Sequence, residues 1–405
     1  MSIENFTEEK DMKFSGMNKQ EESKYFEMLD KKNRNRKKSA RCIYTGCKKH
    51  SIGSHSISKN SHIKNIAENG EVMSFCPIRQ GENKELLLRK VGINQASVFH
   101  GFCKEHDELF QSIDINGICT YKDLFLQCYR SVCYWLHMLT VDGSTMGELQ
   151  KYTDEVMRGL FKRIVPSFDY DAVRFDKEYE ENKVDFVKSI RELKTLLETQ
   201  VECIYSDRKI DNSVLVQIGD VEILFRKVEE VIPVVLNTMN TVVTGKDNIF
   251  QIVLPNKTDT DIIVINASHK RVVLLDTWKV ATSNMLNIIE LIESWMIANE
   301  IWYIQPSVIE KIPEARLQII CEDIRYWQGE HQLWEVYDMS IFDDLRQKHF
   351  KIYKDNDNLD DEYEEKERKK FIPQKRLNKE QREQNMRRLM GKLQYYGDFQ
   401  DMIKE

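Results

Sequence analysis

Apolar residues recur at helical spacing over two long stretches in the first half of the chain. The first stretch covers residues 121–164 and the second covers residues 176–206, each with an apolar residue every three or four positions. Pro166 follows the first stretch, and a residue that lacks a backbone N–H ends a helix. This pattern predicts a central helical region over residues 116–210.

The pattern changes in the second half of the chain. Short runs rich in β-branched residues appear, each bounded by Gly, Asn, Asp or Pro, which is typical of β-strands. Helical spacing returns over residues 282–300 and 306–327, on either side of the strand-like residues 301–305, and again over residues 338–353. We therefore predict a mixed α/β domain over residues 211–353, with strands at residues 214–228, 231–244, 249–255, 261–268 and 271–278.

The remaining segments carry weaker structural signals. Residues 1–30 are polar and acidic, and residues 42–115 are short, mixed and turn-like. Residues 354–405 form a charged tail in which a run of acids precedes a run of bases. Such blocks are typical of solvated or flexible segments with an occasional charged helix.

The composition excludes several classes of protein. The 405 residues are 41% hydrophobic and 31% charged, and no run of about 20 apolar residues is present to span a bilayer. The first residues lack a basic segment followed by an apolar one, so we expect no secretory signal. Nine cysteines, an odd number, indicate reduced thiols in the cytoplasm. With 16 Gly and 7 Pro, the chain is neither collagen-like nor largely disordered.

Two short-spaced pairs of metal-ligating residues stand out. Four residues separate Cys42 from Cys47, and two residues separate Cys103 from His106. Thiolate sulfur and imidazole nitrogen are the ligands that structural zinc prefers, and four of them complete its tetrahedron. A glycine lies just before the second residue of the first pair and just before the second pair, which permits tight turns. We therefore predict a structural Zn²⁺ site of the treble-clef type, with the second pair at the start of a helix.

The alternative is a set of unrelated cysteines with a surface histidine. His50 and Cys76 are further candidate ligands if one member of the two pairs does not bind. Most of the other cysteines lie in apolar helical contexts, where a cysteine acts as a small hydrophobic residue. We expect four of them to pack in the core: Cys128, Cys133, Cys203 and Cys321.

A histidine lies shortly after the first ligand pair. His55 lies eight residues after Cys47, and residues 40–112 resemble the HNH (ββα-metal) endonuclease family. They also resemble HNH-like regions fused to larger domains in bacterial proteins of defence or mobile loci. The resemblance implies that His55 takes a proton from the water that attacks a phosphodiester. It also implies that Asp107 holds a catalytic Mg²⁺ or Mn²⁺ ion that stabilises the leaving oxygen.

The chain departs from the family pattern at two positions. Ser54 stands where the family has an acidic metal ligand, and serine is a poor ligand for a hard cation. The middle asparagine of the family is matched only weakly, by Asn94 or Ser97. A structural or zinc-binding role is therefore the alternative for His55, and Asp107 can equally be an acid that complements a helix N-terminus.

A basic run directly precedes the first ligand pair, although the whole chain has a net charge of −6. Basic side chains beside a nuclease-like motif can neutralise phosphates and steer DNA toward the site. The alternative is a solvated tail, because basic runs are common. The residues that we expect to contact DNA are Lys31, Lys32, Arg34, Arg36, Lys37 and Lys38.

The C-terminal half contains none of the familiar catalytic motifs. We find no phosphate-binding glycine-rich loop, no Gly-x-Ser-x-Gly and no His-Glu-x-x-His. Its aromatic residues fit a hydrophobic core, with a ligand or protein-partner surface as the alternative. They are Trp295, Trp302, Tyr303, Tyr326, Trp327 and Trp334.

These patterns together predict an α+β protein. Its parts are an N-terminal zinc-bound treble-clef (HNH-like ββα) module over residues 31–115, the central helical region and the C-terminal mixed α/β domain, a candidate site for a protein partner. The resemblance implies a metal-dependent endonuclease that hydrolyses DNA, of the kind that serves anti-phage defence. The absence of a long apolar run predicts no membrane association. The alternative is a zinc-stabilised, catalytically degenerate module that binds nucleic acid or protein, which Ser54 favours.

Overall fold

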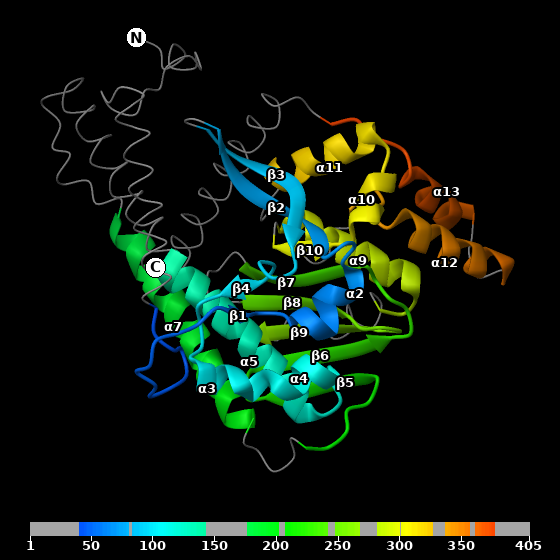
Figure 1. Cartoon of the computed structure of the whole chain (residues 1–405). Coiled ribbons are helices and arrows are strands. Elements are labelled where there is room, and N and C mark those ends of the chain that lie inside the picture. The colour runs from blue at the N-terminus through cyan, green and yellow to red at the C-terminus, as the bar shows by residue number, and fades with distance from the viewer. Residues whose placement is uncertain are drawn as a thin grey trace, which may run out of the picture.

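An eight-stranded antiparallel sheet forms the centre of the molecule (Figure 1). The computed structural model describes residues 40–80, 83–142, 176–201, 207–241, 248–267, 282–299, 301–326, 337–356 and 361–376. The strand order is β3-β2-β10-β7-β8-β9-β6-β5, and every neighbouring pair is antiparallel. The strands are β2 (Glu71–Gln80), β3 (Asn83–Gly92), β5 (Ser213–Ile218), β6 (Val221–Val228), β7 (Val234–Thr241), β8 (Asn248–Pro255), β9 (Thr260–Ala267) and β10 (Trp302–Ile304).

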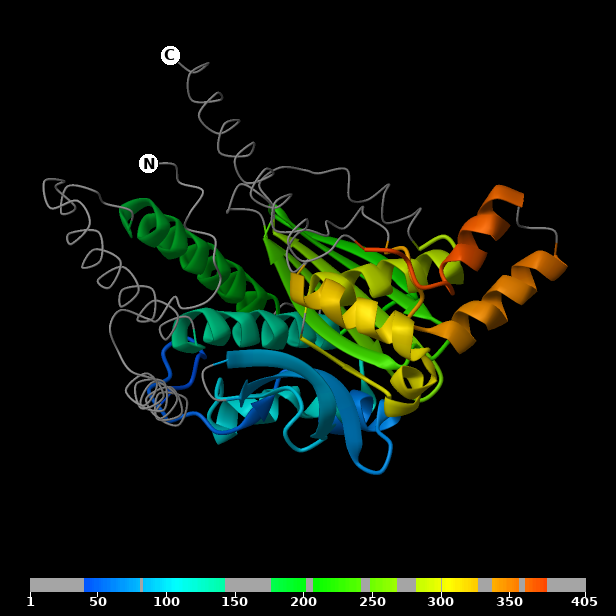
Figure 2. The ribbon, with the colours of Figure 1, turned by 90° about the horizontal axis from the view of Figure 1, so that it is seen from above.

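The central strands of this sheet are buried on both faces, which explains the nearly continuous apolar runs of β8 and β9. On β8, Phe250 and Ile252 pack into one hydrophobic cluster, while Ile249 and Val253 pack into the other. Figure 2 shows helices on both sides of the sheet. The first cluster includes α5 (Tyr121–His137) and α7 (Asp176–Val201). The second includes α9 (Met285–Ala298), α10 (Pro306–Lys311), α11 (Glu314–Tyr326) and α12 (Asp343–Asp355).

Local sequence signals set where several of these helices begin. The side chain of Thr120 accepts the backbone N–H of Asp123, whose carboxylate accepts in return, and this capping box starts α5. Asn284 caps α9 by accepting the backbone N–H of Asn287. Pro306 occupies the first turn of α10, where its missing N–H costs no helical hydrogen bond.

A smaller group of elements lies before α5. Strands β1 (Ser54–His55) and β4 (Val98–Phe99) pair with each other, and α3 (Lys104–Asp107) follows β4. The other short helical segments are η2 (Lys59–Ile63), α2 (Lys64–Ile66), η3 (Glu108–Phe110), α4 (Gln111–Asn116) and, after α5, η4 (Met138–Asp142). Between β1 and β4 the chain makes the β2–β3 hairpin, which joins the large sheet where Met73 pairs with Ile304.

Most of the elements predicted from the sequence are present. Strands β5 to β9 and β10 lie in the predicted strand segments, and α5, α7, α9 and α12 lie in the predicted helical ones. The predicted strand at 271–278 and the helical residues 143–164 lie outside the described residues. The structure differs from the prediction at residues 306–327, where a single helix was predicted and that prediction is wrong. Pro313 divides it into α10 and α11, because proline disfavours helical geometry at the preceding residue.

The other difference is the β2–β3 hairpin, which the turn-like reading of residues 42–115 missed. Ten residues on each side pair in continuous register, from Glu71 opposite Gly92 to Gln80 opposite Asn83. These strands mix charged and apolar residues without regular alternation, so the sequence carries no period-two signal. Strands from the segments predicted as separate N-terminal and C-terminal units therefore share one sheet, and the predicted domain boundaries stay predictions.

Buried ion pairs attach the C-terminal helices to the second layer. Arg346 of α12 is fully buried between Glu293 of α9 and Glu367 of α13 (Asp361–Lys369).

The side chains of Trp295 and Trp302 are each 1% exposed, which confirms the core prediction for these two aromatic residues. The side chains of Tyr326, Trp327 and Trp334 lie outside the described part of the chain. No helix within that part is long and apolar enough to cross a membrane.

One buried histidine gives the fold a specific sensitivity to acid. His62 of η2 is 1% exposed, and its Nδ1 lies 3.3 Å from the carbonyl oxygen of Pro255. Burial lowers the pKa of His62 to about 4. A histidine in the unfolded chain has a pKa of about 6.5. Below that pH the unfolded state therefore binds one more proton than the folded state does. We expect the free energy of unfolding to fall by about 3 kcal/mol as the pH drops from about 6.5 to about 4.

Urea denaturation at a series of pH values measures this effect. The His62→Gln variant should lose about 1.4 kcal/mol per pH unit of the slope between pH 6 and about 4.5, because the titrating group is gone. The exposed His50 provides the control variant His50→Gln. If His62→Gln keeps the full slope of the wild type, the acid sensitivity belongs to other groups.

Candidate metal centre

The first ligand pair lies on a tight turn. The backbone N–H of Cys42 donates to the carbonyl of Lys49 at 2.9 Å, and that of Cys47 donates to the carbonyl of Tyr44 at 3.1 Å. Gly46 adopts a φ of +79°, a left-handed conformation that costs a glycine little. The turn therefore directs both sulfur atoms to the same side.

The second ligand pair lies on a loop held against this turn. The backbone N–H of Ile43 donates to the carbonyl of Gly101 at 2.8 Å, and that of Ile52 donates to the carbonyl of Phe102 at 2.7 Å. A Cβ at Gly101 would lie 2.1 Å from a ring carbon of Phe99, so only glycine fits here. Cys103 then occupies the N-cap position of α3, which places His106 in the first helical turn.

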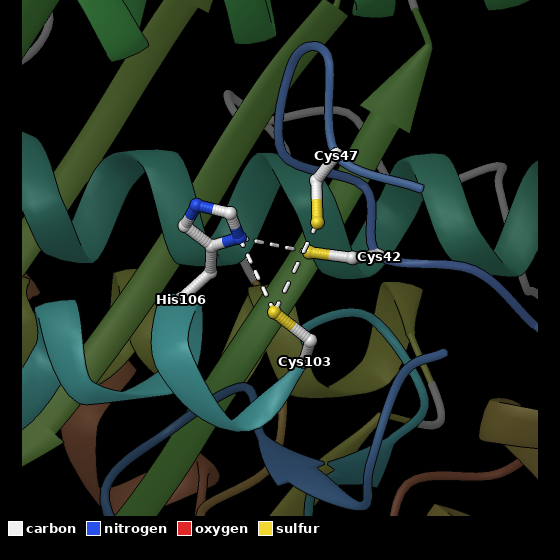
Figure 3. Close-up of side chains that lie close together, drawn as sticks. All are labelled: Cys42, Cys47, Cys103 and His106. Carbon is white, nitrogen blue, oxygen red and sulfur yellow. Dashed lines mark hydrogen bonds between the residues drawn. The ribbon is translucent and has the colours of Figure 1, made fainter. Parts of the chain in front are cut away.

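The four predicted ligands meet in one cluster, which we call the Cys/His cluster (Figure 3). Their ligand atoms all lie within 4.8 Å of one another. Nδ1 of His106 is 3.3 Å from Sγ of Cys42 and 3.3 Å from Sγ of Cys103, and the Sγ atoms of Cys47 and Cys103 are 4.0 Å apart. In a tetrahedral zinc site, metal–ligand bonds of about 2.0–2.3 Å separate neighbouring ligand atoms by about 3.5–3.8 Å. Three sulfurs and one imidazole nitrogen at these separations can hold a zinc ion.

Two of the three cysteines in the cluster are buried. Cys42 is 6% exposed and Cys103 is 3% exposed. Burial raises the pKa of the Cys42 thiol to about 11. At Cys103 burial also opposes ionisation, but hydrogen bonds from the backbone N–H of His106 and from the neighbouring thiols outweigh it and lower the pKa. A bound cation would supply the charge that lets all three sulfurs ionise together.

The Cys/His cluster is braced by contacts that the sequence did not reveal. The ring of Tyr44 stacks on the imidazole of His106, with centroids 3.9 Å apart. Thr45 donates its backbone N–H and its hydroxyl to the two carboxylate oxygens of Glu198 on α7, at 3.1 and 2.6 Å. The buried amine of Lys194 lies 2.6 Å from both partners. The contacts of Thr45 with Glu198 and Lys194 join residues about 150 positions apart, so spacing along the chain gives no signal for them.

Of the two candidate ligands outside the pairs, His50 does not belong to the Cys/His cluster, and the side chain of Cys76 lies outside the described part of the structure. His50 is exposed, pairs in an isolated bridge with Arg41 and lines an open cavity of about 380 Å³ beside Cys103. Its wall also carries Lys49, Lys104 and two glutamates, so its charge is mixed. The backbone of Cys76 lies within β2.

His55, the predicted catalytic histidine, lies on β1 opposite Val98 of β4. Its side chain is half-buried, and its Nδ1 is 2.9 Å from the carbonyl oxygen of Ala96 and 3.3 Å from Oγ of Ser97. A carbonyl only accepts, so Nδ1 carries the proton of the neutral ring. Burial lowers the pKa of His55, which favours that neutral form. Within the described residues, no side chain or backbone group hydrogen-bonds its Nε2.

Asp107 and Ser54, the other two residues considered for a catalytic metal site, do not form a second ligand cluster with His55. Asp107 is half-buried at the end of α3. Ser54 is 1% exposed, and its hydroxyl has no hydrogen-bond partner among the described residues. Over the same residues, the Cys/His cluster is the one group in which three or more Cys, His, Asp or Glu ligand atoms lie close together. His55 and Asp107 therefore share no second site of that kind.

Two further polar contacts near His55 were not predicted. Lys59 donates to the side-chain carbonyl of Asn94 at 3.1 Å. Arg130 of α5, which is buried, makes a two-pronged ion pair with Asp114 at 2.8 and 2.9 Å. The basic run Lys31–Lys38, by contrast, lies outside the described residues.

Comparison with known proteins adds no relative to this geometry. No family model, no curated protein and no solved structure matches the chain significantly.

Proposed function

We propose that this protein is a metal-dependent endonuclease that hydrolyses phosphodiester bonds of DNA, with an HNH-like module at its N-terminus. The observation that carries the proposal is the position of His55. It lies on a two-stranded sheet that is followed by a helix, and a zinc-competent Cys/His cluster links the segments before and after that sheet. This order of elements supports a treble-clef, ββα-type arrangement.

The proposed chemistry assigns His55 the role of general base. Its Nδ1–H donates to the carbonyl of Ala96, which leaves Nε2 to accept a proton from the attacking water. The lowered pKa of His55 keeps the ring neutral near pH 7, as a base requires. A Mg²⁺ or Mn²⁺ ion bound there would supply positive charge to the leaving oxygen, and Asp107 is the residue that would hold it.

The zinc ion is proposed to be structural. All four ligands are protein side chains, so no position stays open for a substrate or water. In this proposal zinc fixes the turn before β1 and the start of α3. The module is proposed to act on DNA in the cytoplasm, and its resemblance to regions of bacterial defence loci supports a role as an anti-phage effector.

The His55→Ala variant tests the role of the base. We expect cleavage of a labelled DNA duplex to slow by about 10²–10⁴-fold, the usual contribution of one positioned base. Zinc content and DNA affinity should stay close to the wild-type values, because His55 is not one of the clustered ligands. The control is His50→Ala, which replaces an exposed histidine outside the cluster. Equal cleavage by His55→Ala and wild type would remove His55 from the mechanism.

A binding module is the second candidate function. The observations that favour it are Ser54 at the acidic position and the lack of a second three-ligand site among the described residues. A mobility-shift assay on the cleavage reactions separates the two functions. Stable complexes with intact DNA, at every divalent metal tested, would support binding without cleavage.

A further inference from the structure

Ser97 has an unusual backbone conformation beside His55. Its φ is +60°, in the left-handed region that serine seldom adopts, and the residue is 4% exposed. Non-glycine residues persist in this region only where surrounding contacts hold them, and such residues concentrate at functional sites. The contacts of Ser97 therefore indicate what its conformation serves.

Several hydrogen bonds hold Ser97 in place. Its backbone N–H donates to the hydroxyl oxygen of Tyr303 at 2.8 Å, and its carbonyl accepts the N–H of Ser56 at 2.8 Å. Its Oγ donates to the carbonyl of Ile57 at 3.1 Å. Two of these partners directly follow His55 in the sequence, whereas Tyr303 belongs to the large sheet.

The N–H of Ser97 and the carbonyl of Ala96 belong to one peptide group. The carbonyl end of this group accepts Nδ1–H of His55 at 2.9 Å, and the N–H end donates to Tyr303. A peptide group is planar and rigid, so fixing the direction of its N–H also fixes the direction of its C=O. Hydrogen bonds in such a chain also polarise one another. The hydroxyl of Tyr303 and the imidazole of His55 are thus connected through a single rigid unit.

Tyr303 is itself firmly held. It lies on β10 and pairs with Val235 of β7, in the interior of the eight-stranded sheet. Its neighbour Trp302 is 1% exposed and donates its indole N–H to the carbonyls of Met296 and Asn299. The strand therefore gives the hydroxyl a fixed reference position relative to the small β1–β4 sheet.

We propose that Tyr303 is a positioning residue that orients His55 through the Ala96–Ser97 peptide group. By fixing that carbonyl, Tyr303 holds the His55 ring in the Nδ1–H form with Nε2 available as a base. The role in cleavage rests on the proposed nuclease function, whereas the control of the ring does not. The eight-stranded sheet then acts as the support of the site.

Nitrogen-15 NMR of the histidine rings in the full-length protein tests this proposal without reference to activity. The wild type should show His55 as the Nδ1–H form at neutral pH, and Tyr303→Phe should shift it toward a mixture with the Nε2–H form. Tyr337→Phe is the matched control, because it also removes a buried tyrosine hydroxyl. That hydroxyl donates to Asp323 at 2.8 Å, whereas the Ala96–Ser97 peptide group hydrogen-bonds to His55 and Tyr303. It should leave the His55 signals unchanged.

Ser97→Gly separates the peptide group from the serine hydroxyl, whose Oγ lies 3.3 Å from Nδ1 of His55. Glycine keeps the left-handed backbone, so this variant should retain the Nδ1–H form. An Nε2–H ring in the wild type, or wild-type signals in Tyr303→Phe, would overturn the proposal. So would a Ser97→Gly variant that alone shifts the ring, because the hydroxyl would then be the orienting group.

Cleavage kinetics distinguish this proposal from the nuclease proposal. In Tyr303→Phe we expect kcat to fall about tenfold with little change in KM, the scale of one hydrogen bond. If the NMR signals shift as expected but the wild type cuts no DNA, Tyr303 still positions His55 and the nuclease function fails. If the wild type cuts DNA and Tyr303→Phe matches it in both kcat and ring form, the positioning role fails alone.

Discussion

Removal of zinc is expected to unfold the segments that carry the Cys/His cluster. The purified protein should contain about one zinc per chain, since the four ligands form one tetrahedral set. Zinc binding contributes about 10–16 kcal/mol to the folding of isolated zinc modules, which is as large as the whole stability of a typical domain. Among the described residues, two backbone hydrogen bonds join the two ligand loops, from Ile43 to Gly101 and from Ile52 to Phe102. At about 1 kcal/mol each, they contribute far less than a bound zinc ion would.

Hydrogen exchange with and without a zinc chelator measures this effect. Chelation should remove protection first from the turn at residues 42–52 and from α3, and later from α7, which Thr45 contacts through Glu198. The Cys47→Ser variant should behave like the chelated protein. Its control is Cys119→Ser, at an exposed cysteine outside the cluster. Protein that binds no zinc, or that keeps its protection after chelation, would contradict the zinc assignment.

Neutralising the basic run Lys31–Lys38 is expected to weaken DNA affinity and to remove most of its dependence on salt concentration. Each phosphate contact contributes about −0.9 to the slope of log affinity against log salt concentration, so six contacts contribute about −5. Six to ten such contacts change the affinity by about 10³–10⁵-fold between 50 and 200 mM salt. A variant with all six basic residues replaced by glutamine should lose most of this salt dependence without any change in sequence preference.

A matched variant controls for the change in total charge. It replaces six basic residues of the C-terminal tail with glutamine and should keep the wild-type slope. They are Lys375, Lys379, Arg382, Arg387, Arg388 and Lys392. An equal loss of slope in both variants would show that net charge, and not the basic run before the first ligand pair, sets the affinity.

The features that could be predicted from the sequence are those encoded by local patterns. The four candidate zinc ligands were predicted because two pairs with short spacing can be recognised without knowledge of the fold. Strands such as β8 and β9 were found because they are buried on both faces and read as apolar runs. The start of α5 at residue 121 was predicted from helical spacing, and the structure shows a capping box there at Thr120.

The features that could not be predicted depend on contacts between distant residues. The pattern along the sequence does not indicate which strands pair, so the pairing of Met73 with Ile304 was not predicted. The contact between Tyr303 and Ser97 spans 206 positions and uses a backbone N–H that any residue other than proline could offer. The left-handed backbone of Ser97 could not be predicted either, because glycine or asparagine is the usual residue in that conformation.

Cleavage of supercoiled plasmid by the wild-type protein tests the central claim most directly. The zinc-loaded protein is incubated with plasmid, with and without added Mg²⁺ or Mn²⁺, and its zinc content is measured in parallel. We expect nicked and then linear DNA to form only when the divalent ion is added. Plasmid that stays supercoiled under every divalent ion, with protein that is fully loaded with zinc, would contradict the endonuclease proposal.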